Sequence, residues 1–155
     1  MRDYDKSNNP LPFSEIDAYS DKFNAETVIN RMIEGLGFRY YWATDGLRDI
    51  DLSYKPSDDS RSSLDVLQHI YGLTEMVIFA FQNKEYPTET KYEMSFTEYR
   101  TETLLNLKKM SDMLIEELKI SEVSVKINFG GQSMAFPFWN AINGPLSDAI
   151  WHTGQ

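Results

Sequence analysis

The chain contains no cysteine among its 155 residues. This absence excludes a disulfide framework, thiolate zinc ligands and a cysteine nucleophile. It is compatible with the reducing cytoplasm, which is the localisation that we expect.

Positive charge is scarce. The sequence has 15 Lys and Arg against 24 Asp and Glu, a formal net charge of -9, and no segment forms a basic stripe. Nucleic acid is therefore not an expected partner, because neutralisation of phosphates supplies much of that affinity. The acidity itself indicates little beyond solubility.

Long apolar runs are also missing. The longest, Met76 to Phe81, is far shorter than the roughly 20 residues that a membrane span needs, and residues 1–10 are too polar for a signal peptide. With 41% hydrophobic residues, the chain can bury one sizeable core. We therefore expect a single soluble domain over residues 1–155, with no membrane partner.

The N-terminal half predicts an arm followed by two helices. Residues 1–23 are rich in polar residues and read as an arm, and Asn24 is a candidate N-cap for a helix that ends at Asp45-Gly46. Gly35 and Gly37 lower the propensity of this helix by roughly 1 kcal/mol each, so either another helix packs closely there or a groove opens. Residues 49–61 read as a loop, and the second helix runs from a capping box at Ser62 to about residue 82.

The C-terminal half predicts a third helix, a hairpin and a divided last helix. Residues 83–94 read as a polar loop, and a capping box at Ser95 begins the third helix. Alternation in residues 123–136 around Gly130-Gly131 predicts a β-hairpin. The last helix should start near Pro137 and be kinked or split at Gly144-Pro145. Together these elements predict an all-α helical bundle with a small hairpin before the last helix.

Histidine occurs only twice, at positions 69 and 152. On its predicted helix, His69 shares a face with apolar residues, so its ring should point toward an apolar interior. Asp148 and His152 are spaced i and i+4 and therefore lie on one face of the last helix. Two imidazoles and one carboxylate can hold a divalent metal if the two helices face each other. The alternatives are that both histidines are satisfied core residues and that Asp148 is only a helix cap.

Other residues are weaker candidates for the site. Asp65 could orient His69, although capping is its expected role, and Glu75 lies too far around the helix to be a co-ligand. Gln155, one turn after His152, could bond within the site or cap the last turn. Four aromatic residues could line a pocket beside a metal, but we expect them in the core: Phe136, Phe138, Trp139 and Trp151.

From about residue 24 onward, the order of elements resembles the DinB/YfiT-like superfamily of metal-dependent enzymes. The resemblance is carried by His69 early in the second helix and by the closing His152-Thr153-Gly154-Gln155, which is similar to the end of the family's H-x-x-x-H-R-G-Q motif. It implies a four-helix bundle in which His69, Asp148 and His152 hold the metal.

The sequence departs from the family motif at three points. Asp148 stands where the motif has its first histidine, Thr153 stands where it has arginine, and the family's helix normally continues past the position of Gln155. The resemblance therefore predicts a last helix truncated at residue 155. The carboxylate makes the ligand set harder in character but leaves it able to accept zinc or nickel, with iron or manganese as alternatives.

The resemblance implies a hydrolase or a thiol-dependent transferase acting on a small-molecule substrate, with a low-molecular-weight thiol as one class of cofactor. It also implies a homodimer. The alternative is a non-catalytic helical bundle, a binding or stress-response protein that kept the fold and lost the metal.

Overall fold

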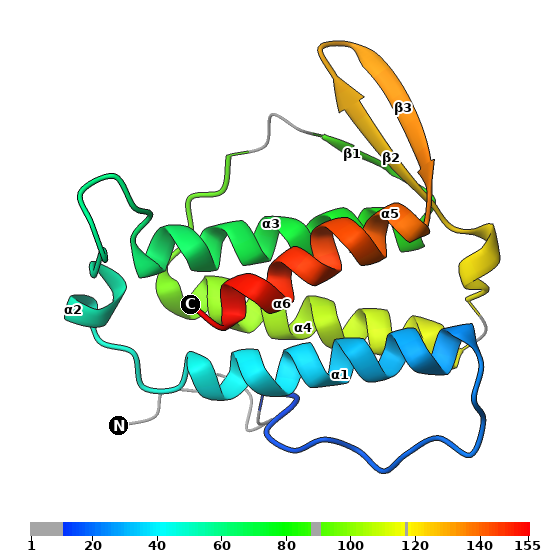
Figure 1. Cartoon of the computed structure of the whole chain (residues 1–155), viewed down its shortest axis with the longest axis horizontal. Coiled ribbons are helices and arrows are strands. Elements are labelled where there is room, and N and C mark those ends of the chain that lie inside the picture. The colour runs from blue at the N-terminus through cyan, green and yellow to red at the C-terminus, as the bar shows by residue number, and fades with distance from the viewer. Residues whose placement is uncertain (1–10, 88–90, 117) are drawn as a thin grey trace.

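In a computed structural model of the chain, the residues that can be described are 11–87, 91–116 and 118–155, and they form a mainly helical protein with one small sheet (Figure 1). Three of the four principal helices are long and continuous, and the fourth is the C-terminal segment, which is divided into shorter helices. The elements, in chain order, are α1 (Ala25–Ala43), α2 (Asp49–Leu52), α3 (Ser63–Phe81), β1 (Glu85–Pro87), α4 (Phe96–Ile115), β2 (Ser124–Phe129), β3 (Gln132–Pro137), α5 (Trp139–Ala141) and α6 (Ser147–Thr153).

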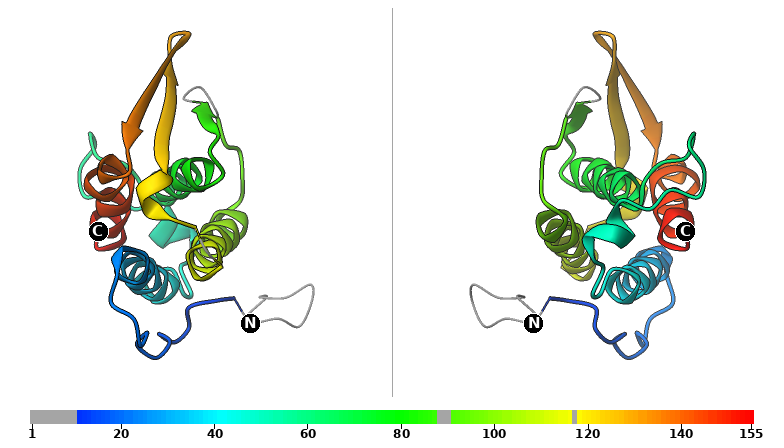
Figure 2. Two further views of the ribbon diagram at one scale, coloured as in Figure 1. Left: turned by 90° about the vertical axis from the view of Figure 1, so that its right-hand side faces the viewer. Right: turned by 90° about the vertical axis from the view of Figure 1, so that its left-hand side faces the viewer.

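The helices pack as a bundle in which each principal helix touches two others. Helix α4 packs on α1 and α3, and α6 packs on the same two helices from the other side. The end-on views show these four helices at the corners of the bundle, with the sheet projecting from one side (Figure 2). The prediction of a predominantly helical bundle with a hairpin before its last helix is confirmed in this broad form.

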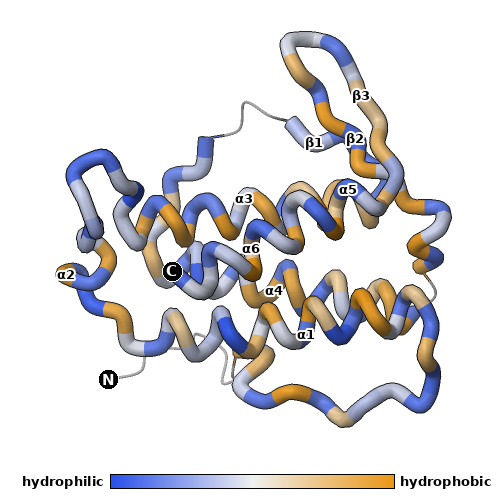
Figure 3. The backbone as a smooth tube through the Cα atoms, viewed as in Figure 1, coloured by the Kyte–Doolittle hydropathy of each residue, from blue (hydrophilic) through white to orange (hydrophobic). Residues whose placement is uncertain are grey.

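Alternation of apolar and polar residues explains why the helices assemble in this way. Along each helix, hydrophobic and hydrophilic segments alternate, as expected for amphipathic helices that bury one face (Figure 3). The core joins residues from all four helices, and its fully buried members include Ile33, Ile70, Leu104 and Ala141. Helix α3 is long and apolar enough to cross a membrane by length and composition alone. A buried core helix can meet the same criteria of length and composition, and nine residues of α3 are buried here.

The predicted helix starts are correct. Asn24, Ser62 and Ser95 are the N-caps of α1, α3 and α4, and each forms a reciprocal capping box with the residue three positions later. In α3 the Asp65 carboxylate accepts hydrogen bonds from the backbone N–H and the hydroxyl of Ser62, at 2.9 and 2.7 Å. Each cap satisfies backbone donors that the first helical turn leaves open.

Two segments that we predicted as loops contain regular structure. Residues 49–52 form the short helix α2, held by an ion pair between Arg48 and Asp51 at 2.8 Å. Residues 85–87 form β1, which pairs in parallel with β2 and widens the predicted hairpin into a three-stranded sheet. Both elements depend on partners that local sequence periodicity does not reveal, and three or four residues are too few to establish a period.

The described part of the arm, residues 11–23, runs along the outer side of α1 (Figure 1). Trp42 donates from Nε1 to the Ser14 carbonyl at 3.1 Å, and Arg31 donates to the Asp17 carbonyl at 2.8 Å. The ring of Phe13 lies against Gly37, where a Cβ would come within 2.5 Å of it. The glycine in α1 therefore makes room for the arm, and neither a second helix nor a groove explains it. The first ten residues of the arm lie outside the described part of the chain.

Replacing Gly37 by alanine should lower the free energy of unfolding by about 1–2 kcal/mol. The new methyl group would displace the Phe13 ring, and the free-energy cost of this displacement exceeds the gain in helix propensity. Gly35→Ala is the matched control, since its Cβ meets only the end of the flexible Arg39 side chain. Urea denaturation of both variants measures the difference. Equal or greater stability of Gly37→Ala would contradict this packing.

The C-terminal helical segment is divided as predicted. Between α5 and α6, residues Ile142–Leu146 form a π-helical turn in which Gly144 leaves helical geometry (φ -105°, ψ -107°) just before Pro145. The aromatic prediction is correct only in part. Phe138 is buried and Phe136 packs against the core, but Trp139 and Trp151 are 73% and 71% exposed, so neither tryptophan is a core residue. Because the kink changes which face of the helix is buried, the spacing of apolar residues across it does not predict which of them are in the core.

Candidate metal centre

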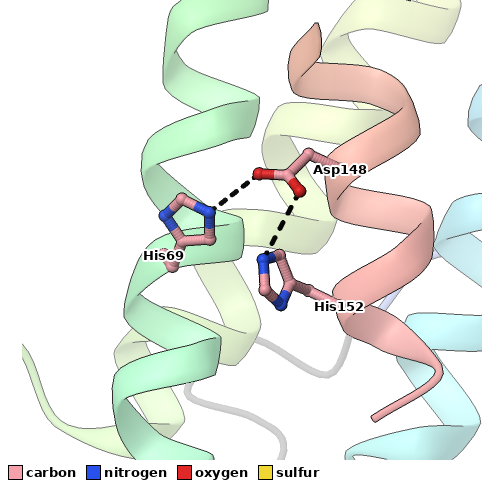
Figure 4. Close-up of side chains that lie close together, drawn as sticks. All are labelled: His69, Asp148 and His152. Carbon is pink, nitrogen blue, oxygen red and sulfur yellow. Dashed lines mark hydrogen bonds and ion pairs between the residues drawn. The ribbon is translucent and has the colours of Figure 1, made fainter. Parts of the chain in front are cut away.

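Three side chains from two helices converge on one point. Figure 4 shows His69 on α3 facing Asp148 and His152, which stand one turn apart on α6. Asp148 Oδ2 lies 2.9 Å from His69 Nε2, and Asp148 Oδ1 lies 3.4 Å from His152 Nε2. The two imidazole rings meet edge to face, with centroids 4.7 Å apart. The predicted grouping of His69, Asp148 and His152 is therefore present in the structure.

The turn at Gly144 and Pro145 places α6 against α3 and so positions the carboxylate. Asp148 is the second residue of α6, close to the helix start that the sequence predicted. It does not cap that helix, because the residue at the N-cap is Leu146 and no side-chain cap bond is formed. The alternative that Asp148 serves only as a cap is wrong, since both of its oxygens face imidazole nitrogens.

His152 is held by a residue one turn further on. Its Nδ1 lies 2.6 Å from Gln155 Oε1, which can only accept a hydrogen bond. Nδ1 is therefore the donor in this bond, and Nε2 is the ring atom that faces Asp148. Both roles predicted for Gln155 are observed, because its side chain bonds within the site and its backbone N–H donates to the His152 carbonyl at 3.2 Å, closing the last turn. Metal-binding histidines are commonly oriented by such a bond on their second nitrogen.

His69 is less enclosed than the sequence indicates. Its side chain is 32% exposed, against 15% for His152, and it borders a cleft. The prediction that its ring points into an apolar interior is therefore confirmed only in part. Leu73 and Ala80, on the same predicted stripe, are buried, but His69 lies where α3 and α6 leave an opening.

The donor set fits a divalent metal ion. The three donor atoms lie within 4.8 Å of one another. Two ligands at about 2.1 Å from a tetrahedral metal are roughly 3.4 Å apart. The separation of His152 Nε2 from Asp148 Oδ1 already has this value, whereas His69 Nε2 lies 2.9 Å from the other oxygen, Oδ2. Two imidazoles and a carboxylate could thus hold a metal ion after the side chains shift.

The three side chains open into a cleft of about 920 Å³. Its walls come from the end of α1, the segment 47–61, the first half of α3 and α6. Apolar side chains such as Leu47, Val66 and Ile70 make up one part of the lining, and Ser60, Ser63 and Thr153 add hydroxyl groups. Such a mixture of apolar walls and a few polar groups is typical of small-molecule sites.

A second cleft of about 470 Å³ is also bordered by His69. Tyr86 and Tyr92 line it above Gly72, with their hydroxyl oxygens 3.4 Å apart. Burial raises the pKa of Tyr92 well above its usual range, and the neighbouring Tyr86 hydroxyl raises it further. The Tyr92 hydroxyl is therefore a neutral group at physiological pH and not a base.

The remaining candidates have structural roles. Asp65 caps α3, as expected, and Ser62 lowers the pKa of its carboxyl group through hydrogen bonds. Glu75 accepts a hydrogen bond from Asn106 at 2.6 Å and is not near the donor group, as the helical spacing predicted. Sequence reasoning missed Arg61, which lines both clefts. It stands in a polar loop with no periodicity, so no local signal could have identified it.

No family model, curated protein or solved structure matches this chain. The class of protein is therefore defined by the fold and the site alone: a mainly helical protein with a His-Asp-His group that could hold a metal ion.

Proposed function

We propose that this chain is a metal-dependent enzyme of the DinB/YfiT-like type, acting on a small molecule bound in the cleft beside His69, Asp148 and His152. The observation that carries the proposal is the convergence of three donor atoms, from helices far apart in sequence, within 4.8 Å at the wall of a cleft. The order of the four packed helices and the hairpin before the last one also agrees with this family.

For the metal we propose zinc or nickel, with iron and manganese as alternatives. Imidazole nitrogen suits zinc, nickel and iron, and the carboxylate suits manganese, so this ligand set does not select strongly among the four ions. Once the ligands are in place, Gln155 keeps the His152 ring in the orientation that presents Nε2.

The proposed reaction is hydrolysis or group transfer. A divalent metal held by these residues would supply a Lewis acid for such chemistry. The chain itself contributes a cleft that binds and orients the substrate, and its apolar walls exclude water from part of it. Because the chain has no cysteine, a thiol nucleophile in a transferase reaction would come from a low-molecular-weight thiol cofactor.

One observation favours the second candidate, a non-catalytic bundle with a degenerate site. The Asp148 carboxylate is already paired with His69 at 2.9 Å, so part of the cluster is satisfied by its own hydrogen bond. In that case the three residues would serve as an interhelical link between α3 and α6, and chelators would leave the protein unchanged.

Elemental analysis of the purified protein, with His69→Ala, Asp148→Ala and His152→Ala, separates the two candidates. The metal proposal predicts close to one equivalent of metal in the wild type and a large loss in each variant. Undiminished metal content in all three variants would end the proposal. A wild type without metal that also fails to bind added zinc would support the non-catalytic bundle.

Replacing Gln155 by leucine should weaken zinc binding by about tenfold, because the His152 ring loses the acceptor that fixes its proton on Nδ1. Gln155→Glu should retain the affinity, since a carboxylate also accepts this bond. Competition with a chromogenic zinc chelator measures both variants. Equal affinity of Gln155→Leu and wild type would show that the bond has no positioning role.

A further inference from the structure

The cleft beside the three metal-binding candidates has an uneven charge distribution. Among the described residues that line it, Arg61 is the only lysine or arginine and Asp148 is the only aspartate or glutamate. Asp148 faces the two histidines and is engaged there. Any anionic group that enters the cleft therefore has a single positive side chain to meet, in a protein whose formal net charge is -9.

Arg61 is held at the wall of the cleft by its backbone. It immediately precedes Ser62, the N-cap of α3, whose capping box fixes this end of the helix. The Ser63 backbone N–H donates to the Tyr54 carbonyl at 3.1 Å and ties the preceding loop to the same point. The backbone of Arg61 is thus fixed near the helix start, and its exposed side chain starts from the rim of the cleft.

The guanidinium is available to a ligand. Within the described part of the chain, Arg61 forms neither a hydrogen bond nor an ion pair. Asp65 is an acidic neighbour whose pKa is lowered mainly by hydrogen bonds from Ser62 and to a smaller extent by the charge of Arg61, and its carboxylate is occupied by the backbone N–H and the hydroxyl of Ser62. A planar guanidinium that is not engaged within the protein is suited to paired hydrogen bonds with an oxyanion.

The remainder of the lining indicates what such an anion is attached to. Leu47, Val66, Leu67 and Ile70 give the cleft that Arg61 and the histidines share an apolar wall. An apolar body can bury surface there while its charged end stays at Arg61. A phosphate monoester carries close to two charges at neutral pH, which one arginine does not balance, whereas a carboxylate carries one.

We propose that Arg61 binds the carboxylate of a small monocarboxylic acid whose apolar body lies along this wall, and that it thereby sets the substrate class of the cleft. That this acid is a substrate rests on the proposed function, whereas its binding to Arg61 does not. It assigns Arg61 a role in specificity and none in the chemical step.

Binding can be tested on the metal-free protein by isothermal titration calorimetry with octanoate and with octanamide, which has the same chain but no charge. The wild type should bind octanoate about fivefold more tightly than octanamide, and the preference should shrink at high salt. Arg61→Gln should abolish the preference and leave octanamide binding unchanged. Lys55→Gln is the matched control, because it removes the same charge from the same exposed loop without lining the cleft.

The inference is overturned if wild type binds the two ligands equally, or if Lys55→Gln loses the preference as completely as Arg61→Gln does. Circular dichroism of both variants checks their folding, and both positions are exposed. A second pair of probes separates this result from the proposed function. With added zinc, octanohydroxamic acid and its analogue with a terminal carboxylate should both bind. The analogue should bind more tightly to the wild type, and this advantage should be lost in Arg61→Gln. If zinc does not bind at all, the proposed function fails, while the octanoate comparison still decides the role of Arg61.

Discussion

Replacing Asp148 by asparagine should weaken zinc binding by roughly 100- to 1,000-fold, which is more than the loss of a residue that only orients a ligand. The side chain keeps its shape and can still hydrogen-bond to His69, but a neutral amide is a poor ligand for a divalent metal. The structure places both Asp148 oxygens opposite imidazole nitrogens, so no other described carboxylate or histidine can take its place without moving a helix.

Asp148→His is the informative partner of this variant. It introduces a third histidine in place of the carboxylate, and the i and i+4 spacing to His152 still suits two ligands on one helical face. We expect it to bind zinc at least as tightly as the wild type. Competition titrations against a zinc chelator measure all three proteins. Similar affinities for wild type and Asp148→Asn would remove Asp148 from the ligand set.

The second large effect concerns the core and not the site. Arg100 is only 3% exposed and links α4 to the end of α1. It donates from Nε to the Thr44 hydroxyl at 2.9 Å and from Nη2 to the Tyr41 carbonyl at 3.1 Å, and its guanidinium lies over the Tyr41 ring. Arg100→Met should lower the free energy of unfolding by about 3 kcal/mol, because it leaves a buried carbonyl and the nearby Asp45 without their charged partner.

Thr103→Val is the matched control for this effect. Thr103 is fully buried on the same helix, and its hydroxyl lies beside the Tyr40 hydroxyl, which is also buried, without strict hydrogen-bond geometry to any described residue. Its replacement should change the free energy of unfolding by less than about 1 kcal/mol. Urea denaturation followed by far-ultraviolet circular dichroism compares the two. A loss of less than about 1 kcal/mol for Arg100→Met would mean that the buried network contributes little.

The parts of the fold that local sequence determines were predictable. Asn24, Ser62 and Ser95 mark helix starts because a side chain and a backbone three residues away satisfy each other, and this needs no distant partner. The Gly130-Gly131 turn is similarly local, since both glycines adopt positive φ, which other residues rarely do.

What depends on distant partners was not predictable. Strand β1 exists because it pairs with β2, which lies about 40 residues later, and Gly37 is explained only by the arm residue Phe13. The exposure of Trp139 and Trp151 follows from the kink at Gly144, which breaks the helical period between them.

The site shows the same division between local and distant information. The spacing of Asp148 and His152 on one face was evident from the sequence, and so was the position of His69 in a separate helix. Their convergence was not, because it depends on how α6 packs against α3. The two roles for Gln155 could not be separated in advance, and Arg61 lies in a loop whose path determines whether it reaches the cleft.

The central claim is that His69, Asp148 and His152 bind one metal ion together. X-ray absorption spectroscopy of the zinc-loaded protein tests it most directly, with Asp148→Asn and His69→Ala as comparisons. The claim predicts one zinc per chain, a nearest shell of nitrogen and oxygen at about 2.0–2.1 Å, and outer-shell scattering from two imidazole rings that falls to one ring in His69→Ala. A spectrum with zinc surrounded only by water or exposed carboxylates, unchanged in both variants, would contradict it.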